Sequence, residues 1–382
     1  QLRWPAMRLL FFGTYDAAAH PRVAILRDGL AGHGATVREC NVPLGLSTAA
    51  RVSMLRRPST LPRLLVRLAW CWATLVARSA RYRRDGGWPD VVVVGYLGHF
   101  DVLLARRLFP HVPVVLDHLV GASDTAADRG VSSGLRPRLL RRLDETALGS
   151  ADVVVVDTAE HLAALPERHR RRALVVPVGA PASWYAAADR PTDLTAVGQP
   201  LRIVFFGLFT PLQGAPVIGA ALAALADDDL EVTMVGTGQD HDETRSLAAA
   251  NRRVTWVDWV APDQLPALVA RHDVCLGIFG TGAKALRVVP NKVFQGAAAG
   301  CALVTSETGP QRRLLGDAAV LVPAGDAAAL AAALRDLAGD RARLHAARAA
   351  SSELARTAFT AAAVTTPLLD RLHAVVPRRL PT

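Results

Sequence analysis

Arg8-Leu9-Leu10-Phe11-Phe12-Gly13-Thr14 near the start of the chain returns at its middle as Arg202-Ile203-Val204-Phe205-Phe206-Gly207-Leu208. In each copy an apolar run of strand length ends in glycine, and a loop leads into a helix-periodic segment, residues 23–30 or 215–225. A Rossmann-like unit begins in this way, because a glycine after the first strand lets backbone N–H groups and a helix N-terminus approach an anion. The repeat therefore predicts two such units, facing each other across a cleft.

Short apolar runs continue through both halves of the chain. They cover residues 36–40, 91–94, 114–116, 153–156 and 174–176, and then 231–235, 254–257, 274–278, 302–305 and 319–322. Such runs, alternating with helical segments, are typical of parallel strands that are covered on both faces. We expect an α/β fold with two parallel sheets, in domains 1–185 and 201–355. A linker over 186–200 would join them, and a helical tail over 356–382 would cross back to the first domain.

Composition limits the classes of function. The 382 residues, 51% of them hydrophobic, suffice for two cores, and the net charge of +10 is carried by arginine, as is typical of a GC-rich bacterial genome. No basic face with interleaved aromatics is evident, so we expect no nucleic-acid partner. Cys40, Cys71, Cys275 and Cys301 lack metal-site spacing and are interpreted as buried thiols in a reducing cytoplasm.

One stretch carries charge of a single sign, since no acidic residue occurs from Asn41 to Arg84. Apolar side chains recur there at helix spacing while arginines line another face: Leu61, Leu64, Leu65, Leu68, Trp72, Leu75 and Val76, against Arg63, Arg67, Arg78 and Arg81. The apolar segment is too short to cross a bilayer but would suit the surface of an anionic leaflet. The alternative is a helix packed on its own sheet. We expect a cytoplasmic protein, either free or peripheral to the inner face of the membrane.

The two lysines of the chain, Lys284 and Lys292, both lie within residues 280–295. Their retention in an arginine-rich chain favours a point-charge role such as neutralising phosphate. Pro290 and Asn291 are typical of a helix start, so Lys292 is expected in the first helical turn. A cation there costs about 0.3–1 kcal/mol unless an anion is bound. The alternative is a solvated basic loop.

With these motifs placed, the chain resembles the GT-B glycosyltransferases over nearly its whole length, in particular the retaining glycosyltransferase family 4. The matching residues are Gly13-Thr14-Tyr15 with Pro21-Arg22, Asp117-His118, Phe206-Gly207, Val235-Gly236-Thr237-Gly238, and the run from Pro290 through Gln295 to Gly300-Cys301-Ala302-Leu303-Val304-Thr305. The resemblance implies a nucleotide-diphosphate-sugar donor, held mainly by the second domain, and an acceptor that enters against the first. The candidate donor-binding residues are Gly13, Thr14, Gly207, Gly236, Gly238, Lys284, Asn291 and Gln295.

The chain departs from the family at charged positions. Two basic residues that hold the donor diphosphate in the family correspond here to Leu208 and Gln213, and two glutamates correspond to Arg287 and Gln295. We hypothesise that three cations replace the lost positive charge: Lys284, Arg287 and Lys292. Gln295 shares the helix face of Lys292 and is placed to hydrogen-bond a ribose or sugar hydroxyl.

His118 follows the strand predicted at 114–116, at the edge where open α/β sheets bind ligands. It matches the family histidine that contacts the transferred sugar or the acceptor, although a lone histidine is also common in a purely structural role. Asp117 would orient its imidazole or bind an acceptor hydroxyl. The catalytic candidates are therefore His118, Asp117, Arg287 and Lys292.

We expect a retaining hexosyltransferase acting on a lipid-linked, envelope-polysaccharide or natural-product hydroxyl. No metal or cofactor is expected, because basic residues and helix dipoles can offset the charge of the leaving group. The acidic run Asp227-Asp228-Asp229 is interpreted as a solvated turn. Trp256 and Trp259 are interpreted as core packing, with a nucleobase platform as the alternative. The alternative is a catalytically silent homologue that binds a nucleotide-sugar as a scaffold or partner subunit. An epimerase would need an acid and histidine set that we do not find.

Overall fold

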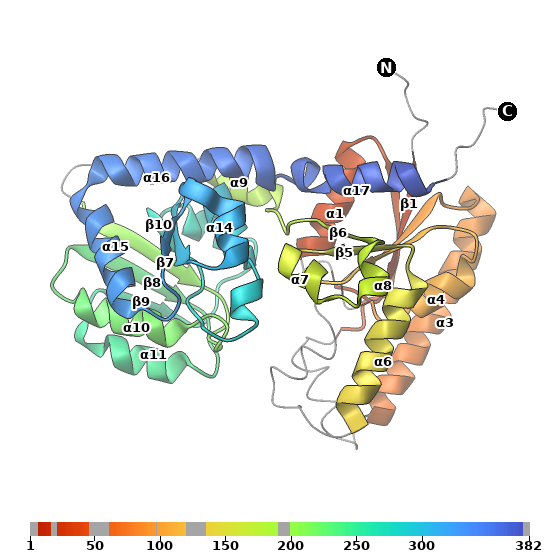
Figure 1. Cartoon of the computed structure of the whole chain (residues 1–382), viewed down its shortest axis with the longest axis horizontal. Coiled ribbons are helices and arrows are strands. Elements are labelled where there is room, and N and C mark those ends of the chain that lie inside the picture. The colour runs from red at the N-terminus through yellow and green to blue at the C-terminus, as the bar shows by residue number, and fades with distance from the viewer. Residues whose placement is uncertain are drawn as a thin grey trace. The chain divides into compact units, whose positions relative to one another are not determined.

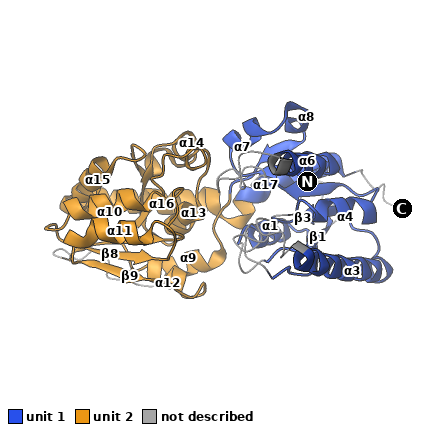
Figure 2. Ribbon diagram, turned by 90° about the horizontal axis from the view of Figure 1, so that it is seen from below, with its two compact units in different colours: residues 1–177, 364–382 blue, residues 178–363 orange. Residues whose placement is uncertain are grey.

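The computed structural model describes residues 7–16, 21–45, 61–96, 98–119, 135–189 and 199–376. The chain forms two compact units, Gln1–Pro177 with Val364–Thr382, and Val178–Ala363 (Figure 2). The boundary at Val178 precedes the linker expected at 186–200, most of which lies outside the described residues. Helix α9 (Ala182–Ala188) is part of unit 2 because its Trp184 stacks on Phe206, with ring centroids 5.5 Å apart.

Unit 1, drawn in Figure 1, is built on a six-stranded parallel sheet. The strand order is β2-β1-β3-β4-β5-β6. Its strands are β1 Arg8–Gly13, β2 Thr36–Asn41, β3 Val91–Val94, β4 Val114–Asp117, β5 Val153–Val156 and β6 Ala173–Val175. Its helices are α1 Pro21–Gly32, α3 Leu61–Gly86, α4 Asp101–Leu108, α6 Leu135–Ser150, α7 Ala159–Ala164, α8 Glu167–Arg170 and most of α17 Ala361–Val375. Strand order reverses between β1 and β3, so their carboxyl ends border a ligand crevice of the kind expected in open sheets.

Unit 2 repeats the design with the order β12-β11-β10-β7-β8-β9. Its strands are β7 Leu201–Phe206, β8 Leu230–Val235, β9 Val254–Val257, β10 Val274–Leu276, β11 Ala302–Ser306 and β12 Val320–Val322. Besides α9 its helices are α10 Ala215–Ala224, α11 His241–Leu247, α12 Leu265–Val269, α13 Asn291–Ala298, α14 Gly309–Leu315, α15 Ala327–Gly339 and α16 Arg341–Leu354. Here the order reverses between β7 and β10, so the loops after these two strands border the corresponding crevice.

The predicted fold class is confirmed, since both sheets are parallel and every predicted strand is present. Strand β10 ends at Leu276, two residues before the expected end. At the next residue, Gly277, a Cβ would lie 2.0 Å from Thr305 Oγ1, so the chain passes close to β11 there. Between α16 and α17 the chain makes a π-helical turn at Ala355–Phe359. Hydrogen bonds from unit 2 fix this turn, because Tyr185 Oη donates to the Ala355 carbonyl and the Ala180 N–H to that of Phe359. Helical periodicity carries no sign of such distant bonds.

Within the described part of the chain, no helix is long and apolar enough to span a membrane. The four cysteines are buried free thiols, as predicted.

Candidate functional site

In unit 2 the loops after β7, β8 and β10 pack backbone against backbone at the carboxyl edge of the sheet. A Cβ on Gly236 would lie 2.0 Å from the Gly207 carbonyl oxygen, and one on Gly238 would lie 2.3 Å from that of Phe209. Gly207, Gly236 and Gly238 all have positive φ, so a side chain at any of them would also strain the backbone. The structure thus brings the three predicted glycines together at one edge.

Lys292 extends into this edge from the first turn of α13, as the helix-start residues predicted. Its side chain is buried, with 4% of the residue exposed. Nζ donates a hydrogen bond of 2.6 Å to Gln213 Oε1 and lies 3.6 Å from the centre of the Phe205 ring. A Cβ on Gly207 would approach the same Nζ to 3.3 Å, so glycine leaves room for the ammonium beside the backbone.

Burial lowers the pKa of Lys292 to about 7, from an ordinary value of 10.5. The aromatic face and the amide oxygen offer partial negative charge, but neither carries a full one. A buried cation without an anion is costly, and a phosphate oxygen would restore the preference for the charged form. The position is therefore suited to an anionic ligand.

The other predicted residues of this segment lie nearer the surface. Lys284 is half-buried and precedes the 3₁₀ turn Ala285–Arg287, whose Arg287 is exposed. Asn291 is exposed and Gln295 is half-buried. The expected set of three cations is thus one buried ammonium and two cations of greater exposure.

Two large apolar side chains that follow strands at the same edge are exposed. Leu208 comes two residues after β7 and is 67% exposed, and Trp259 comes two residues after β9 and is 72% exposed. The interpretation of Trp259 as core packing was therefore wrong. Trp256 does pack, with its ring centroid 6.3 Å from that of Phe209. Exposed apolar groups at a ligand edge can stack on a base or cover a sugar.

In unit 1 the loop after β1 is anchored by a residue that sequence analysis missed. The backbone N–H and the hydroxyl of Thr14 donate to Asp101 Oδ2, at 2.7 and 2.8 Å. Trp72 Nε1 donates to Oδ1 of the same carboxylate at 3.0 Å. Asp101 opens α4 and is separated from Thr14 by 87 positions, so the only sequence signal was an acid in the first turn of a helix.

Asp117 does not orient the imidazole of His118, contrary to the expectation. Its carboxylate accepts Nε–H of Arg22 at 3.2 Å, and both side chains are buried. Arg22 also donates to the carbonyls of Val176 and Pro177, at 2.8 and 2.7 Å. Burial raises the pKa of the Asp117 carboxyl, although Arg22 opposes this. Through these contacts Arg22 links α1 to Asp117 at the end of β4 and to the residues that follow β6.

His118 is buried beside a second histidine, His99, which sequence analysis also missed. Their ring centroids are 5.3 Å apart, and the rings are nearly perpendicular. His99 Nε2 lies 3.2 Å from Asp144 Oδ1 of α6. Neither His99 Nε2 nor His118 Nδ1, both buried, makes a hydrogen bond of good geometry among the described residues. Burial lowers the pKa of His118 to about 4, so the ring is neutral at physiological pH. Its unsatisfied nitrogen is suited to a hydroxyl group.

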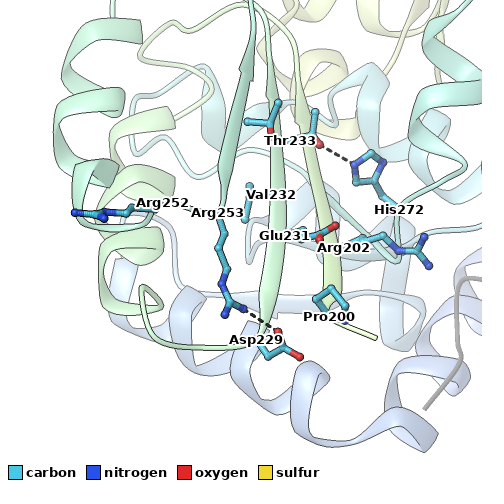
Figure 3. A pocket seen from close by; sticks show the side chains of 10 residues that line it. Pro200, Arg202, Asp229, Glu231, Val232, Thr233, Arg252, Arg253 and His272 are labelled. Carbon is cyan, nitrogen blue, oxygen red and sulfur yellow. Dashed lines mark hydrogen bonds and ion pairs between the residues drawn. The ribbon is translucent and has the colours of Figure 1, made fainter. Parts of the chain in front are cut away.

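The described residues also form a polar hollow of about 430 Å³ at the opposite, amino end of the unit 2 strands (Figure 3). Two of its arginines are paired, since Arg253 lies 2.8 Å from Asp229 and Arg202 lies 3.6 Å from Asp273, which is outside the lining. Asp229 belongs to the acidic run interpreted as a turn. No group of three or more metal-binding side chains occurs in the described ranges.

Residues 200–340 match the family model described as glycosyl transferases group 1. This span contains the unit 2 sheet, its carboxyl-edge loops and Lys292. No curated protein sequence matches the chain.

Solved structures match the chain along nearly its whole length. HepE of Anabaena, in complex with UDP, is 14% identical, covers 97% of this chain and 100% of its own, and has a TM-score of 0.66. Sucrose-phosphate synthase of Thermosynechococcus elongatus is 17% identical, with coverage of 96% and 99% and a TM-score of 0.65. A glycosyltransferase of Rickettsia africae is 12% identical, with coverage of 98% and 100% and a TM-score of 0.65. The fold is that of the GT-B proteins, and the part of unit 2 from residue 200 to 340 is similar to the group 1 glycosyl transferases.

Proposed function

We propose that the protein is a retaining, metal-independent glycosyltransferase of the family 4 type that moves a hexosyl group from a nucleoside-diphosphate sugar to a hydroxyl. The observation that carries the proposal is the buried ammonium of Lys292 at the glycine-lined carboxyl edge of unit 2. The matched glycosyltransferase domain and the solved structures support it.

The donor diphosphate would bind beside Lys292, Gly207 and the N-terminus of α13. HepE has been solved with UDP and with UDP-glucose, which supports a nucleotide-sugar donor here. The Lys292–Gln213 hydrogen bond also supports the hypothesis that Lys292 replaces positive charge that this chain lacks. Gln213 stands where the family has a basic residue, and its side chain contacts the proposed replacement. Lys284 and Arg287 would supply further positive charge to the diphosphate from the more exposed side of the site.

In the proposed reaction the bond between the sugar and the diphosphate breaks, and Lys292 with the α13 N-terminus stabilises the charge of the leaving group. The acceptor hydroxyl then attacks from the face that the leaving group vacates, which retains the anomeric configuration, and its proton passes to an oxygen of the departing diphosphate. On unit 1, the unpartnered Nδ1 of His118 would accept or donate a hydrogen bond to a sugar or acceptor hydroxyl. His99 and Asp144 would position that ring.

A second function is favoured by Arg287 and Gln295, which stand where the family has glutamates. The chain would then be a silent homologue that holds a nucleotide-sugar without transferring it. Such a protein would bind donor but would release no nucleoside diphosphate with any acceptor.

Chromatographic detection of released nucleoside diphosphate separates the two. The purified chain is mixed with UDP-, GDP- and dTDP-sugars and a panel of lipid-linked, polysaccharide and small-molecule acceptors. We expect acceptor-dependent release, loss of at least about 10²-fold in turnover for Lys292→Met, and a product whose anomeric configuration by NMR equals that of the donor. Donor binding without release across the panel would support the silent homologue, and inversion would contradict a retaining mechanism.

A further inference from the structure

Helix α3 has two apolar faces, although sequence analysis assigned it one. The first packs on the core of unit 1 through Leu64, Leu68, Cys71, Trp72 and Leu75. The second is exposed to solvent and consists of Pro62, Leu65, Val66, Ala69, Trp70 and Ala73. Sequence periodicity placed Leu65 and Val76 on the same face as these residues, but in the structure both are exposed, at 56% and 40%.

The exposed face is continuous along the helix. Its residues follow the spacing 3, 4, 7, 8 and 11 that places side chains on one side of an α-helix. Val66 is 71% and Trp70 is 64% exposed, and together with Pro62 they line a shallow hollow flanked by Arg63 and Arg67. Scattered apolar residues on a surface need no explanation, but a continuous stripe bordered by one sign of charge marks an interaction site.

The stripe projects beyond the carboxyl edge of the unit 1 sheet. Trp72 is level with Thr14, because both donate to Asp101, while Gly86 at the other end of α3 accepts a bond from Arg8 at the start of β1. The ten residues before Trp72 therefore extend about 15 Å past the carboxyl edge, at 1.5 Å per residue. Figure 1 shows α3 reaching past the strands of unit 1 at that end.

Helix α6 extends past the same edge, since its Asp144 lies beside His99 and the preceding turns continue outward (Figure 1). Its Leu139 is largely exposed, next to exposed arginines at 138, 141 and 142. The sequence has no acidic residue in 61–84 or in 135–143. Both projecting ends thus combine exposed apolar groups with positive charge alone.

We propose that the projecting ends of α3 and α6 dock on an anionic lipid bilayer, with the α3 stripe entering the headgroup region and arginines contacting lipid phosphates. Tryptophan, aliphatic side chains and arginines on one amphipathic helix are the composition of interfacial helices. A second copy of the chain fits poorly, because a symmetric contact would oppose the arginines of the two copies. Docking would bring the edge that holds Thr14 and His118 to the bilayer surface, where a lipid-linked acceptor would lie.

Vesicle flotation of the full chain tests this without any donor or acceptor, so its result is independent of the proposed transferase activity. Vesicles of phosphatidylcholine alone are compared with vesicles that also contain phosphatidylglycerol, at low and high salt. We expect binding to the anionic vesicles that weakens with salt. Each arginine near the surface contributes about fivefold, so Arg63→Gln/Arg67→Gln should lower the partition coefficient by roughly 25-fold.

Matched variants separate the parts of the surface. Val66→Glu/Trp70→Glu should abolish flotation, while Arg252→Gln/Arg271→Gln, which removes two exposed arginines of unit 2, should leave it unchanged. Circular dichroism melts should be the same for all variants, since the altered side chains are exposed. Equal flotation of Val66→Glu/Trp70→Glu and wild type would overturn the proposal. The proposal would also be overturned if light scattering showed that wild type is a dimer, that it does not bind vesicles, and that Val66→Glu/Trp70→Glu is a monomer.

Discussion

The ammonium of Lys292 is buried in unit 2, and only 4% of the residue is exposed to solvent. Among the described residues, the ammonium donates one hydrogen bond, to the amide oxygen of Gln213, and it lies over the Phe205 ring. Burial without a counter-charge brings its pKa to about 7. At about pH 7 the lysine is therefore neutral in roughly half of the ligand-free molecules, and a bound diphosphate would favour the charged form.

The same residue should make stability depend on pH. Between about pH 7 and 10.5 the unfolded chain binds this proton and the folded chain does not, so stability rises with pH across that window. Below about pH 7 both states are protonated and the slope disappears. Within this window we expect the free energy of unfolding of wild type to rise, relative to that of Lys292→Met, by up to about 1.4 kcal/mol per pH unit. Urea unfolding of both proteins near pH 7 and near pH 9 measures this.

Lys284→Met is the control, because it removes a lysine from a less buried position of the same segment. Parallel pH profiles for wild type and Lys292→Met would show that Lys292 keeps an ordinary pKa, and would remove the argument for a buried anion-binding ammonium.

At the scale of elements, the carboxyl edge of the unit 2 sheet depends on loops that approach each other too closely to leave room for a Cβ. Gly236→Ala would place a methyl 2.0 Å from the Gly207 carbonyl oxygen at φ +123°. We expect a loss of about 1–3 kcal/mol from backbone strain alone, together with weaker donor binding because the Gly207 loop must move. Gly282→Ala should stay within about 0.5 kcal/mol, since nothing lies within 4 Å of its Cβ. Equal melting temperatures for the two variants would contradict this packing.

The α1–β4–β6 junction of unit 1 depends on the buried Arg22–Asp117 pair. Arg22→Ala leaves a buried carboxylate without its partner and should cost about 3–5 kcal/mol. Arg27, on the same helix, pairs with Asp28 at the surface, and its replacement by alanine should cost no more than about 1 kcal/mol. Chemical denaturation of both variants measures the difference. A loss for Arg22→Ala as small as that for Arg27→Ala would show that Asp117 is solvated in solution.

At the scale of the whole molecule, the sequence predicted the two sheets because their strands are buried on both faces and form near-continuous apolar runs. It also predicted Lys292 in a first helical turn, because Pro290 and Asn291 are local signals. It could not show that Lys292 points inward, since that depends on which side of α13 meets the β7 loop. Nor could it find Asp101, His99 or the second face of α3, because burial and contact between distant segments decide these.

The central claim is that the buried ammonium of unit 2 grips a diphosphate, and isothermal titration of UDP and GDP into wild type and Lys292→Met tests it most directly. Near pH 8, where Lys292 is largely neutral in the free protein, we expect a preferred nucleotide to bind with uptake of close to one proton, seen by repeating the titration in buffers of different ionisation enthalpy. Lys292→Met should bind at least about tenfold more weakly and take up no proton. Equal affinity and equal proton uptake in the two proteins would contradict the account.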